Sequence, residues 1–538
     1  DIARALIPVF QDPNIRGLAH HAKYDKHVLN RYGIEVTNLE FDTMIAAYLL
    51  GENSVGLKDL AFSRLGIEMT EITNLIGTGR NQLSMNMVPL EQVSQYACGD
   101  VEATFELAEF YRPLLVQQEQ EALFRDIEMP LIAVLEDMER TGIAIDAAYL
   151  AEYESEVKQR VAELEKEITG HAGRPINVNS PKQLGSLLFD ELKLPSGRKT
   201  KTGYSVDQDL LETLRDQHPI IAPILEYKTL LKLVSTYLTA LPDQVNPKTG
   251  RIHTTYNQTV AATGRLASNS PNLQNIPIRT DAGRRVRRAF VADRSERRLF
   301  DDAQLLSADY SQIELRLMAH MSGEPFLVDA FRSGADIHRA TASLVYGVDA
   351  ESVTSDMRRV AKTVNFGLLY GMQAYGLSRD TGLSRAEAQA FIDQYWSRLP
   401  RVKSYFEETL KFGLDKGYVQ SLYGRRRAVP DLASGNGQRR MGAERVAINM
   451  PLQGTAADIM KIAMIRVHDA LQAHRDSARV LLQVHDELVL EVAGDKVMEI
   501  AHVVKSTMEA AATLAVPLVA DVSAGPNWDD LTDLELNL

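Results

Sequence analysis

Four residues spaced four positions apart offer the clearest chemistry in the sequence: Arg358, Lys362, Phe366 and Tyr370, in the run MRRVAKTVNFGLLYG. Steps of four advance a helical side chain by about 40°, so all four would share one face of a helix about 18 Å long. Two cations followed by two aromatic rings suit a ligand with polyphosphate at one end and a flat base or sugar at the other. A solvated basic turn followed by a buried aromatic turn fits the same spacing, and the run alone leaves both interpretations open.

Two aspartates flank this run in the sequence. Asp309 follows the short apolar stretch 305–308, which predicts a buried strand, and SQIELRLMAH after it predicts a helix. Asp486 lies in VLLQVHDELVLEV, which is typical of two apolar strands joined by a tight hairpin. Carboxylates at the ends of buried strands need a cation or a metal as a partner.

If they lie side by side, Asp309 and Asp486 would repel each other unless cations neutralise them. Two divalent ions about 4 Å apart would do so, and would clamp the attacking and leaving oxygens of a phosphoryl transfer. Magnesium suits such a site because it takes oxygen ligands and keeps substrate phosphates in its shell. The alternative is that each aspartate caps a turn, but the cationic run between them favours phosphoryl transfer.

Three motifs carry a family resemblance. DYSQIELR, RxxxKxxxFGxxYG and VHDELV, in that order, resemble the polymerase motifs of family A DNA polymerases, with support from TGRLASNSPNLQNIPIR, DIHRATA and INMPLQGTAADIMK. The resemblance covers essentially the whole chain and corresponds to the large (Klenow-like) fragment of such enzymes. It implies a multidomain α/β fold, in which a right-hand polymerase of palm, fingers and thumb follows a partial RNase H-like 3′–5′ exonuclease domain. The expected boundaries are 1–118 for the exonuclease-like domain, 119–255 for the thumb, 256–325 and 431–538 for the two parts of the palm, and 326–430 for the fingers.

The resemblance implies template-directed DNA synthesis, in which a primer 3′-hydroxyl attacks the α-phosphate of a deoxynucleotide and pyrophosphate leaves. Asp309 and Asp486 would bind two Mg²⁺ ions, for which Mn²⁺ can substitute, with the Tyr310 carbonyl as a further ligand and Glu487 as an accessory acid. Arg358 and Lys362 would neutralise the triphosphate, and Lys362 is also a candidate proton donor to pyrophosphate. The implied nucleotide-binding residues are Arg358, Lys362, Phe366, Tyr370, Glu314, Gln312 and His338.

Two of these residues would set sugar specificity. Glu314 matches the steric gate of the family, which fills the space of a ribose 2′-hydroxyl. Phe366 in place of a tyrosine implies poor use of dideoxynucleotides, because no phenol hydroxyl is present to replace the missing 3′-hydroxyl. Phe366 would pack on the sugar and base, and Tyr370 would stack near the templating position.

The implied DNA contacts begin with Arg265 and Gln453, which match residues that read the minor groove at the primer terminus. Purine N3 and pyrimidine O2 are both acceptors there, so donors check pairing geometry without reading sequence. Arg445, Asn449 and His485 belong to the same duplex-facing set. The expected partners are primer–template duplex DNA and deoxynucleoside triphosphates, bound by a monomer.

The composition limits the classes of protein to which this chain can belong. The chain has 538 residues, 45% of them apolar, and a formal net charge of −13, so it is a multidomain globular protein that does not bind nucleic acid through bulk charge. Two local runs are basic: residues 279–298 hold eight arginines against three acids, and residues 421–445 hold six against two. The resemblance makes both runs candidate phosphate contacts.

A single cysteine, Cys98, excludes a disulfide framework or a cysteine-based zinc site within one chain, and we expect it to be buried. No apolar run approaches the roughly 20 residues of a membrane span, and no signal peptide is visible. We therefore expect no membrane association and a cytoplasmic setting. The resemblance further implies a bacterial, nucleoid-associated protein with roles in DNA replication and repair.

The N-terminal region departs from the family pattern. Asp25 matches the second exonuclease motif, and Tyr96 and Asp100 match the third. Only 24 residues precede Asp25, and none of them forms the DxE of the first motif. We therefore expect no effective proofreading. A second departure is the charged segment 292–304, for which we expect an exposed loop without an assigned function.

Two other functions compete with a DNA polymerase. A single-subunit RNA polymerase of related fold would share the main motifs, but Glu314 and the exonuclease remnant argue against it. A non-catalytic DNA-binding module is the second alternative, and the presence of Asp309, Asp486 and Lys362 argues against it.

Overall fold

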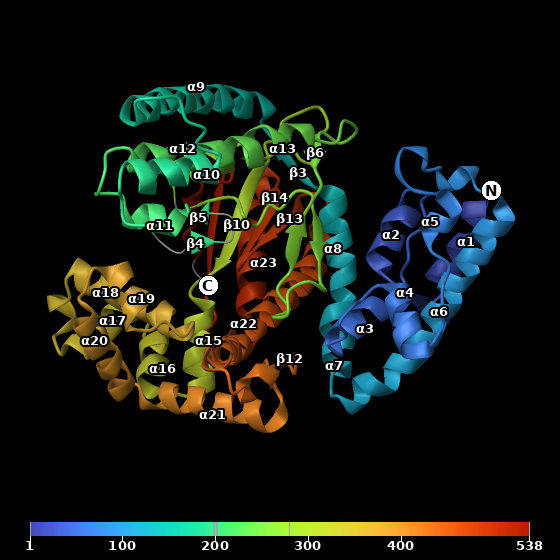
Figure 1. The fold of residues 1–538 in the computed structure, drawn as a ribbon. Coiled ribbons are helices and arrows are strands. Elements are labelled where there is room, and N and C mark those ends of the chain that lie inside the picture. Colours follow the sequence, from blue (N-terminus) through green and yellow to red (C-terminus); the bar gives the residue numbers. More distant parts are fainter. Residues whose placement is uncertain (1, 197–198, 201–202, 279, 537–538) are drawn as a thin grey trace.

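A five-stranded antiparallel sheet lies at the centre of the computed structural model, which describes residues 2–196, 199–200, 203–278 and 280–536. Its strand order is β13-β14-β10-β15-β16, and Figure 1 shows the sheet between the surrounding helices. The strands are β10 (Gln304–Tyr310), β13 (Ala478–Val484), β14 (Glu487–Val492), β15 (Ala520–Gly525) and β16 (Thr532–Asp533). The strand that carries Asp309 is therefore paired on both sides with strands from the end of the chain.

Strand β10 alternates between two cores, as a strand buried on both faces must. Leu306 and Ala308 pack into the core shared with the long helices behind the sheet, whereas Leu305 packs on the opposite face with Phe290 and Trp528. Its odd-numbered residues therefore share one face, with Leu305 in the core and Asp309 at the solvent-exposed end.

One helix of 34 residues, α22 (Gly437–Ala470), crosses behind the sheet and contacts many other elements. At 1.5 Å per residue it is about 51 Å long. Its neighbours include α8 (Met129–Thr141), α15 (Ile313–Ser322), α21 (Pro400–Lys416) and α23 (Val497–Glu509). The helix thus links the surface of the molecule with its buried centre.

The region between α15 and α22, which includes the residues 326–430 expected to form the fingers, is mainly helical. These helices form the group at the lower left and bottom of Figure 1, and a short hairpin follows them. They are α16 (Pro325–Arg332), α17 (Ile337–Tyr346), α18 (Ser355–Leu369), α19 (Ala374–Thr381), α20 (Arg385–Arg398) and α21, followed by β11 (Tyr418–Gln420) and β12 (Arg426–Ala428).

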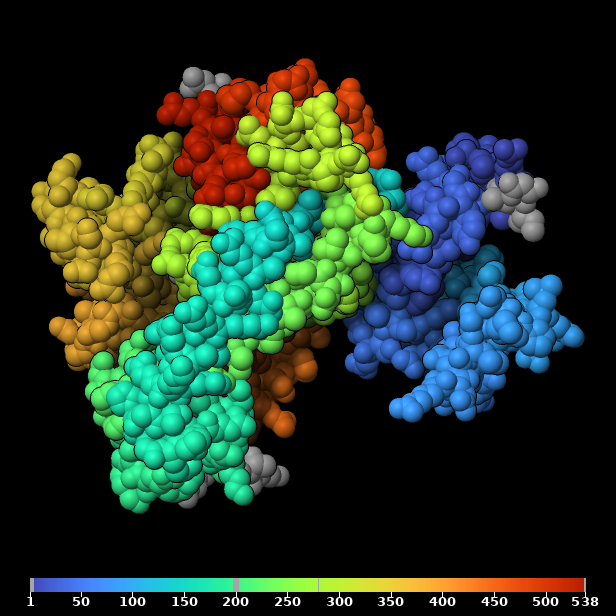
Figure 2. Space-filling model, turned by 90° about the horizontal axis from the view of Figure 1, so that it is seen from above, coloured from blue at the N-terminus to red at the C-terminus, as the bar shows by residue number. Residues whose placement is uncertain are grey.

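Residues 143–257 form a second helical group, which lies over the sheet and fills the front of the molecule in Figure 2. Its outer end has a small core of its own, which includes Leu164, Leu188 and Ile224. The helices are α9 (Ala147–Ala172), α10 (Pro181–Gly185), α11 (Gln208–Thr213), α12 (Ile221–Leu233) and α13 (Ala240–Asp243); the short strands are β3 (Ile143–Ile145), β4 (Lys199–Thr200), β5 (Gly203–Tyr204), β6 (Arg251–Ile252) and β7 (Thr255–Asn257). The segment that follows residue 250 contains two short strands, β6 and β7, which belong to different sheets.

The N-terminal region forms a lobe of its own at the side of the molecule (Figures 1 and 2). It contains α1 (Ile2–Gln11), β1 (Gly17–Ala19), α2 (Ala22–Asn30), β2 (Leu39–Asp42), α3 (Thr43–Leu49), α4 (Leu57–Leu60), α5 (Ile72–Ile76) and α6 (Leu90–Gln117). Strands β1 and β2 are parallel. The expectation that Cys98 is buried was wrong, because the residue lies on an exposed face of α6.

Helix α2 attaches this lobe to α8. Lys23 donates hydrogen bonds to Glu139 and to the Tyr256 carbonyl, and His27 Nε2 lies 2.8 Å from Glu139 Oε2. Asn30 Nδ2 donates to Glu136 Oε1 at 2.8 Å. Lys23, His27 and Asn30 are four and three residues apart, so these contacts come from one face of α2.

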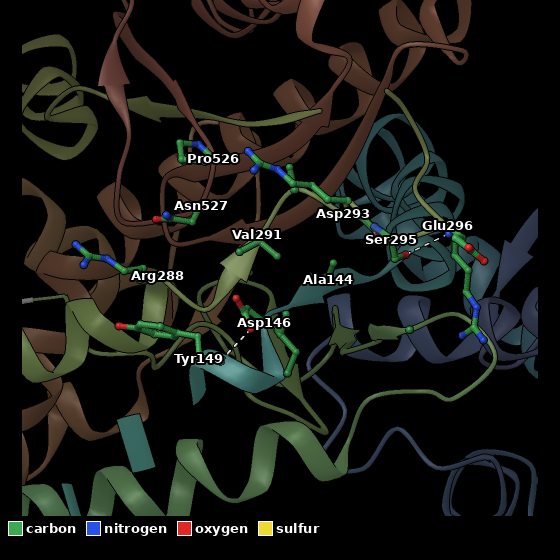
Figure 3. Close-up of a pocket in the computed structure, with 15 residues that line it drawn as sticks. Ala144, Asp146, Tyr149, Arg288, Val291, Asp293, Ser295, Glu296, Pro526 and Asn527 are labelled. Atoms are coloured by element: carbon green, nitrogen blue, oxygen red, sulfur yellow. Dashed lines mark hydrogen bonds between the residues drawn. The ribbon is translucent and has the colours of Figure 1, made fainter. Parts of the chain in front are cut away.

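The segment 292–304 is an exposed loop, as predicted, with anchored ends. The Asp293 amide donates to Glu491 Oε1 at 3.0 Å, and the Phe300 side chain is buried. Figure 3 shows the open cavity of about 740 Å³ beside this loop, lined by Tyr149, Arg288 and Asn527 among others. The loop precedes β10, so the cavity is at the end of that strand opposite Asp309.

Within the described part of the chain, none of the helices combines the length and the apolar character that crossing a bilayer requires.

Candidate active site

The two aspartates that flank the cationic run are brought together by the central sheet. Asp309 is the penultimate residue of β10, and Asp486 lies in the two-residue turn between β13 and β14. The Tyr310 amide donates to the Asp486 carbonyl at 3.1 Å, which ties the end of β10 to the tip of the hairpin. His485, the other turn residue, has a φ of 55°, which gives the tight turn.

Asp309 lies in a row of three carboxylates across the sheet. In the register of the sheet, Asp309 is paired with Glu487 on β14 and with Asp521 on β15. Desolvation, followed by the charges of Glu487, Asp486 and Asp521, raises the pKa of Asp309 to about 7. Desolvation also raises the pKa of Asp486 to about 6. Both carboxylates thus lack a sufficient positive charge within the protein itself.

This donor set fits a divalent cation, because such an ion would stabilise the charged forms of Asp309 and Asp486. No group of three or more His, Cys, Asp or Glu side chains arranged for a metal occurs among the described residues. The remaining ligands would therefore be the Tyr310 carbonyl, substrate phosphates and water, which is the mixed shell that Mg²⁺ favours.

The predicted cationic and aromatic run lies on α18, with Tyr370 as its C-terminal cap. Val360, Ala361, Val364 and Leu368 are buried on one side of the helix. Lys362 is exposed and Phe366 is half-buried, so the run follows the opposite, open side as the spacing predicts.

Arg358 is not free in the structure. Its Nε lies 2.7 Å from Asp336 Oδ2, and its side chain is 39% exposed. Asp336 also caps α17, accepting hydrogen bonds from the amides of His338 and Arg339 at 3.0 and 3.1 Å. A triphosphate that binds Arg358 would have to displace Asp336 from the guanidinium or bind alongside it.

His338 is buried rather than open to the cleft, the pocket lined by Arg265, His485 and Asp486 among others. Only 3% of it is exposed, and its Nδ1 lies 3.1 Å from Asn365 Nδ2. Burial, with the charges of Arg358 and Lys362 adding to it, lowers the pKa of His338 to about 4. The side chain is therefore neutral at pH 7, and this geometry favours a structural role over the predicted triphosphate contact.

Glu314 joins three elements at the edge of the cleft. It lies on α15 and is 6% exposed. Its Oε1 accepts a hydrogen bond from Arg265 Nη2 at 2.6 Å, and its Oε2 accepts one from the Tyr370 hydroxyl. Its predicted gate position therefore comes with two fixed contacts that the sequence motifs alone did not indicate.

The predicted DNA contacts on α22 also follow one face. Arg445 is exposed, while Asn449 and Gln453 are half-buried, and the three are spaced four apart. The Asn449 Oδ1 and the Gln312 Oε1 are buried without a hydrogen-bond partner among the described residues. Orphaned buried acceptors of this kind are rare in folded proteins and are expected where a ligand completes the site.

Several arginines of the first basic run, residues 279–298, form ion pairs within the protein. Arg284, Arg285, Arg288 and Arg298 pair with Asp281, Glu156, Asp529 and Asp301 respectively, and Arg287 is buried. Arg279 lies outside the described residues. Because most of these pairs are exposed, they do not exclude phosphate binding by this run, which stays a prediction. In the second run Arg425 is buried, while Arg427, Arg439 and Arg445 make no recorded ion pair within the described part of the chain.

A buried ion network next to the cleft was missed by sequence reasoning. Arg425 Nε lies 2.8 Å from Asp458 Oδ1, and Lys461 Nζ lies 2.6 Å from Glu128 Oε1; Arg425 also pairs with Glu128. Burial opposes ionisation of Glu128, but Lys461 and Arg425 outweigh it and lower its pKa to about 2. Gly264 packs against Arg425: a Cβ there would lie 2.3 Å from Nε. The network thus supports the loop that carries Arg265.

The predicted exonuclease residues are not assembled into a metal site in the described structure. Asp25 lies on α2, where desolvation and then the charge of Asp42 raise its pKa to about 6. Asp100 lies on α6, next to Tyr96 and Lys58. No cluster of three metal-ligating side chains is present there or elsewhere in the described residues.

Two aspartates lie at the end of a central antiparallel sheet, and the C-cap Tyr370 of the cationic helix α18 contacts Glu314 near them. Together these features define a site of the nucleotidyl-transfer class. The family model for "DNA polymerase family A" matches residues 147–530, and that for "3'-5' exonuclease" matches residues 1–115. The chain belongs to DNA polymerase family A.

Similar proteins agree with this assignment. DNA polymerase I of Chloroflexus aurantiacus is 48% identical over 100% of this chain and 57% of its own length. DNA polymerase I of Pseudomonas aeruginosa is 45% identical over 98% of this chain and 58% of its own length. This chain therefore spans little more than half the length of these relatives.

A solved structure shares the fold over nearly the whole chain. It is the POL domain of Pol1 from M. smegmatis in complex with DNA primer-template and dNTP, with a TM-score of 0.89 and 38% sequence identity. The match covers 98% of this chain and 89% of that chain. The predicted right-hand polymerase fold with a preceding exonuclease-type domain is thereby confirmed.

Proposed function

We propose that this chain catalyses template-directed DNA synthesis, adding deoxynucleotides to a primer 3′-hydroxyl with release of pyrophosphate. The observation that carries the proposal is the convergence of Asp309 and Asp486 at the end of the central sheet, where both have raised pKa values. Lys362 is exposed on α18, the helix whose C-cap Tyr370 contacts Glu314. Family membership and the DNA- and dNTP-bound structural relative support it.

In this proposal the protein's own groups position the substrates. Lys362 and Arg358 hold the triphosphate, and Lys362 donates a proton to the leaving pyrophosphate oxygen. Phe366 packs on the sugar and base, and Glu314 excludes a 2′-hydroxyl. Arg265, Gln453 and Asn449 contact the minor groove at the primer end, where donors report correct pairing.

Metal dependence is general in this family. We propose Mg²⁺, replaceable by Mn²⁺, held by Asp309, Asp486 and the Tyr310 carbonyl. When bound, the ions would lower the pKa of the primer hydroxyl and stabilise charge on the leaving group.

We propose the following domain boundaries: 1–118 exonuclease-like, 119–255 thumb, 256–325 and 431–538 palm, and 326–430 fingers. We also propose that the chain acts as a monomer on primer–template DNA in the bacterial cytoplasm, which size-exclusion chromatography with light scattering would check for the oligomeric state.

Primer extension tests the proposal. Wild-type protein with Mg²⁺ should extend a DNA primer on a DNA template, and Asp309→Ala should lose about 10²-fold or more of that rate. Asp393→Ala, at an exposed position on α20, is the matched control and should extend normally.

Substrate choice separates the proposal from its competitors. Deoxynucleotides should be used and ribonucleotides rejected. Preferential incorporation of ribonucleotides would indicate an RNA polymerase, and DNA binding without any extension by wild type would indicate a non-catalytic module.

A further inference from the structure

Glu487 lies beside the catalytic aspartates with both carboxylate oxygens engaged. Its Oε1 accepts hydrogen bonds from Ser307 Oγ at 2.6 Å and from Trp528 Nε1 at 2.9 Å. Its Oε2 lies 3.7 Å from Arg287 Nη1. Since Glu487 is the register partner of Asp309, these contacts fix a negative charge next to that residue.

The groups that hold Glu487 are themselves immobilised. Trp528 is 2% exposed, and its ring packs edge-on against Phe290, with 5.6 Å between the ring centroids. The Trp528 amide donates to the Phe290 carbonyl at 2.9 Å, which fixes the backbone as well. Arg287 places its guanidinium 4.0 Å from the centre of the indole ring. The indole is therefore clamped between an aromatic ring and a cation.

Ser307 is the second donor to Glu487 Oε1. It lies on β10 two residues before Asp309, so both side chains project from the same face of the sheet. Ser307 is 6% exposed. A hydroxyl at this buried position needs an acceptor, and Glu487 supplies it. Two neutral donors thus share one oxygen of Glu487, while Arg287 faces the other.

We propose that Trp528 is a positioning residue for nucleotidyl transfer, which acts by holding Glu487, together with Ser307, as a fixed anion beside Asp309. This inference rests on the proposed DNA polymerase function. Trp528 touches neither substrate nor the reacting atoms. Without its N–H, Glu487 would keep only the Ser307 hydrogen bond and the longer Arg287 contact, and it would turn more readily into the cleft. There its charge would repel the triphosphate or compete with Asp309 and Asp486 for cations.

The step affected should be the chemistry rather than nucleotide binding. Arg358 and Lys362, which would hold the triphosphate, lie on α18 and make no contact with Trp528. Loss of the indole N–H should therefore lower kcat about tenfold, as is typical for partners of metal-site carboxylates, with little change in the KM for nucleotide. The Mg²⁺ concentration for half-maximal rate should change as well.

A double-mutant cycle tests this. Primer extension would be measured for Trp528→Phe, Glu487→Ala and the double variant, with Ser307→Ala as a second way to release the carboxylate. Trp528→Phe should reduce kcat about tenfold in the wild-type background and have no further effect once Glu487 is alanine. Ser307→Ala should lower kcat in the same direction as Trp528→Phe.

The other tryptophan of the chain provides the control. Trp396 is half-buried on α20, and Trp396→Phe should leave kcat and the Mg²⁺ dependence unchanged. An equal tenfold loss from Trp528→Phe in the Glu487→Ala background would overturn the inference, because it would indicate a packing effect. Unchanged kcat in both Trp528→Phe and Ser307→Ala would overturn it too. Absence of extension by wild type would instead reject the proposed polymerase function.

Discussion

At the scale of single residues, the cleft is held by contacts that a substrate would have to exchange. Arg358 is paired with Asp336, and Arg265 is paired with Glu314. The Arg358–Asp336 pair is partly exposed, and pairs of this kind contribute only about 0–1 kcal/mol, so a triphosphate can replace Asp336 at little cost. The pair thereby holds the Arg358 side chain in position and leaves it available to a substrate. In the Arg265–Glu314 pair the carboxylate is buried, so this contact is held more firmly.

Glu314 leads to a prediction about sugar choice. Its carboxylate is held by Arg265 and Tyr370, so it cannot move aside for a 2′-hydroxyl. Glu314→Ala should raise ribonucleotide incorporation relative to deoxynucleotides by roughly tenfold or more, since pocket clashes of this size give about 10–200-fold discrimination.

Single-nucleotide incorporation with paired ribo- and deoxynucleotides gives this ratio. Tyr370→Phe removes one contact but keeps the carboxylate, and should change the ratio less. A ratio in Glu314→Ala equal to that of the wild type would refute the gate assignment.

Asp309 leads to a prediction about pH and stability. Its pKa is about 7 in the folded protein against 3.8 when unperturbed, so folding favours the protonated form. Its contribution to stability is therefore fully present below pH 3.8 and is lost as the pH rises through about 7. In metal-free buffer, Asp309→Asn should melt higher than wild type at pH 8, with a much smaller difference at pH 5.

Thermal unfolding followed by circular dichroism at these two pH values would check this. Asp393→Asn, at an exposed site, should show no pH-dependent difference from wild type. An Asp309→Asn variant that melts lower than wild type at pH 8 would contradict the predicted sign.

At the scale of elements, the buried network joins three segments. Glu128 precedes α8, Arg425 lies in the β11–β12 hairpin, and Asp458 and Lys461 lie one turn apart on α22. All four side chains are at most 2% exposed. Removing one partner leaves a charge without compensation in a dry environment, which usually costs about 3–5 kcal/mol.

Glu128→Gln should therefore lower the free energy of unfolding by several kcal/mol, of the order given for a broken buried pair. Glu226→Gln breaks the exposed pair between Glu226 and Arg160, whose side chains are each 44% exposed, and should cost about 1 kcal/mol or less. Chemical denaturation of both variants makes the comparison. Similar losses in the two would show that the network does not behave as a buried one.

Elements with a local signal were predictable from the sequence. The spacing of the cationic and aromatic residues predicts one face of a helix, which is α18. Two apolar stretches separated by two polar residues predict the hairpin around Asp486. The network was not predictable, because Glu128 and Arg425 are 297 residues apart and nothing local marks either as buried. Arg287 likewise looks like its solvated neighbours, although it lies against Trp528.

At the scale of the whole molecule, one face of α2 joins the N-terminal lobe to the polymerase part, and a shared apolar core and the Tyr48–Ala261 hydrogen bond add to this contact. Lys23 bridges Glu139 and the Tyr256 carbonyl, and the Tyr256 hydroxyl lies 3.0 Å from the Gln483 amide, next to the catalytic hairpin. The lobe is therefore linked through Lys23 and Tyr256 to strand β13, which leads into the hairpin turn that carries Asp486.

We predict that this lobe does not proofread in the chain studied. The sequence carries Asp25 and Asp100 of the exonuclease motifs but not the DxE of the first motif. A mismatched 3′ end should be removed no faster by wild type than by Asp100→Ala. Gel analysis of a 3′-mismatched primer without nucleotides would show this, and degradation that disappears in Asp100→Ala would contradict it.

The order of strands in the central sheet has a consequence for biosynthesis. Strand β10 is paired only with β14 and β15, which begin 487 − 310 = 177 and 520 − 310 = 210 residues after it ends. At about 5–20 residues per second, a ribosome exposes this apolar strand for roughly 10–35 s before its first partner emerges. Nascent chains should therefore depend on chaperones during this interval, and a message cut short before β14 should yield an aggregating product.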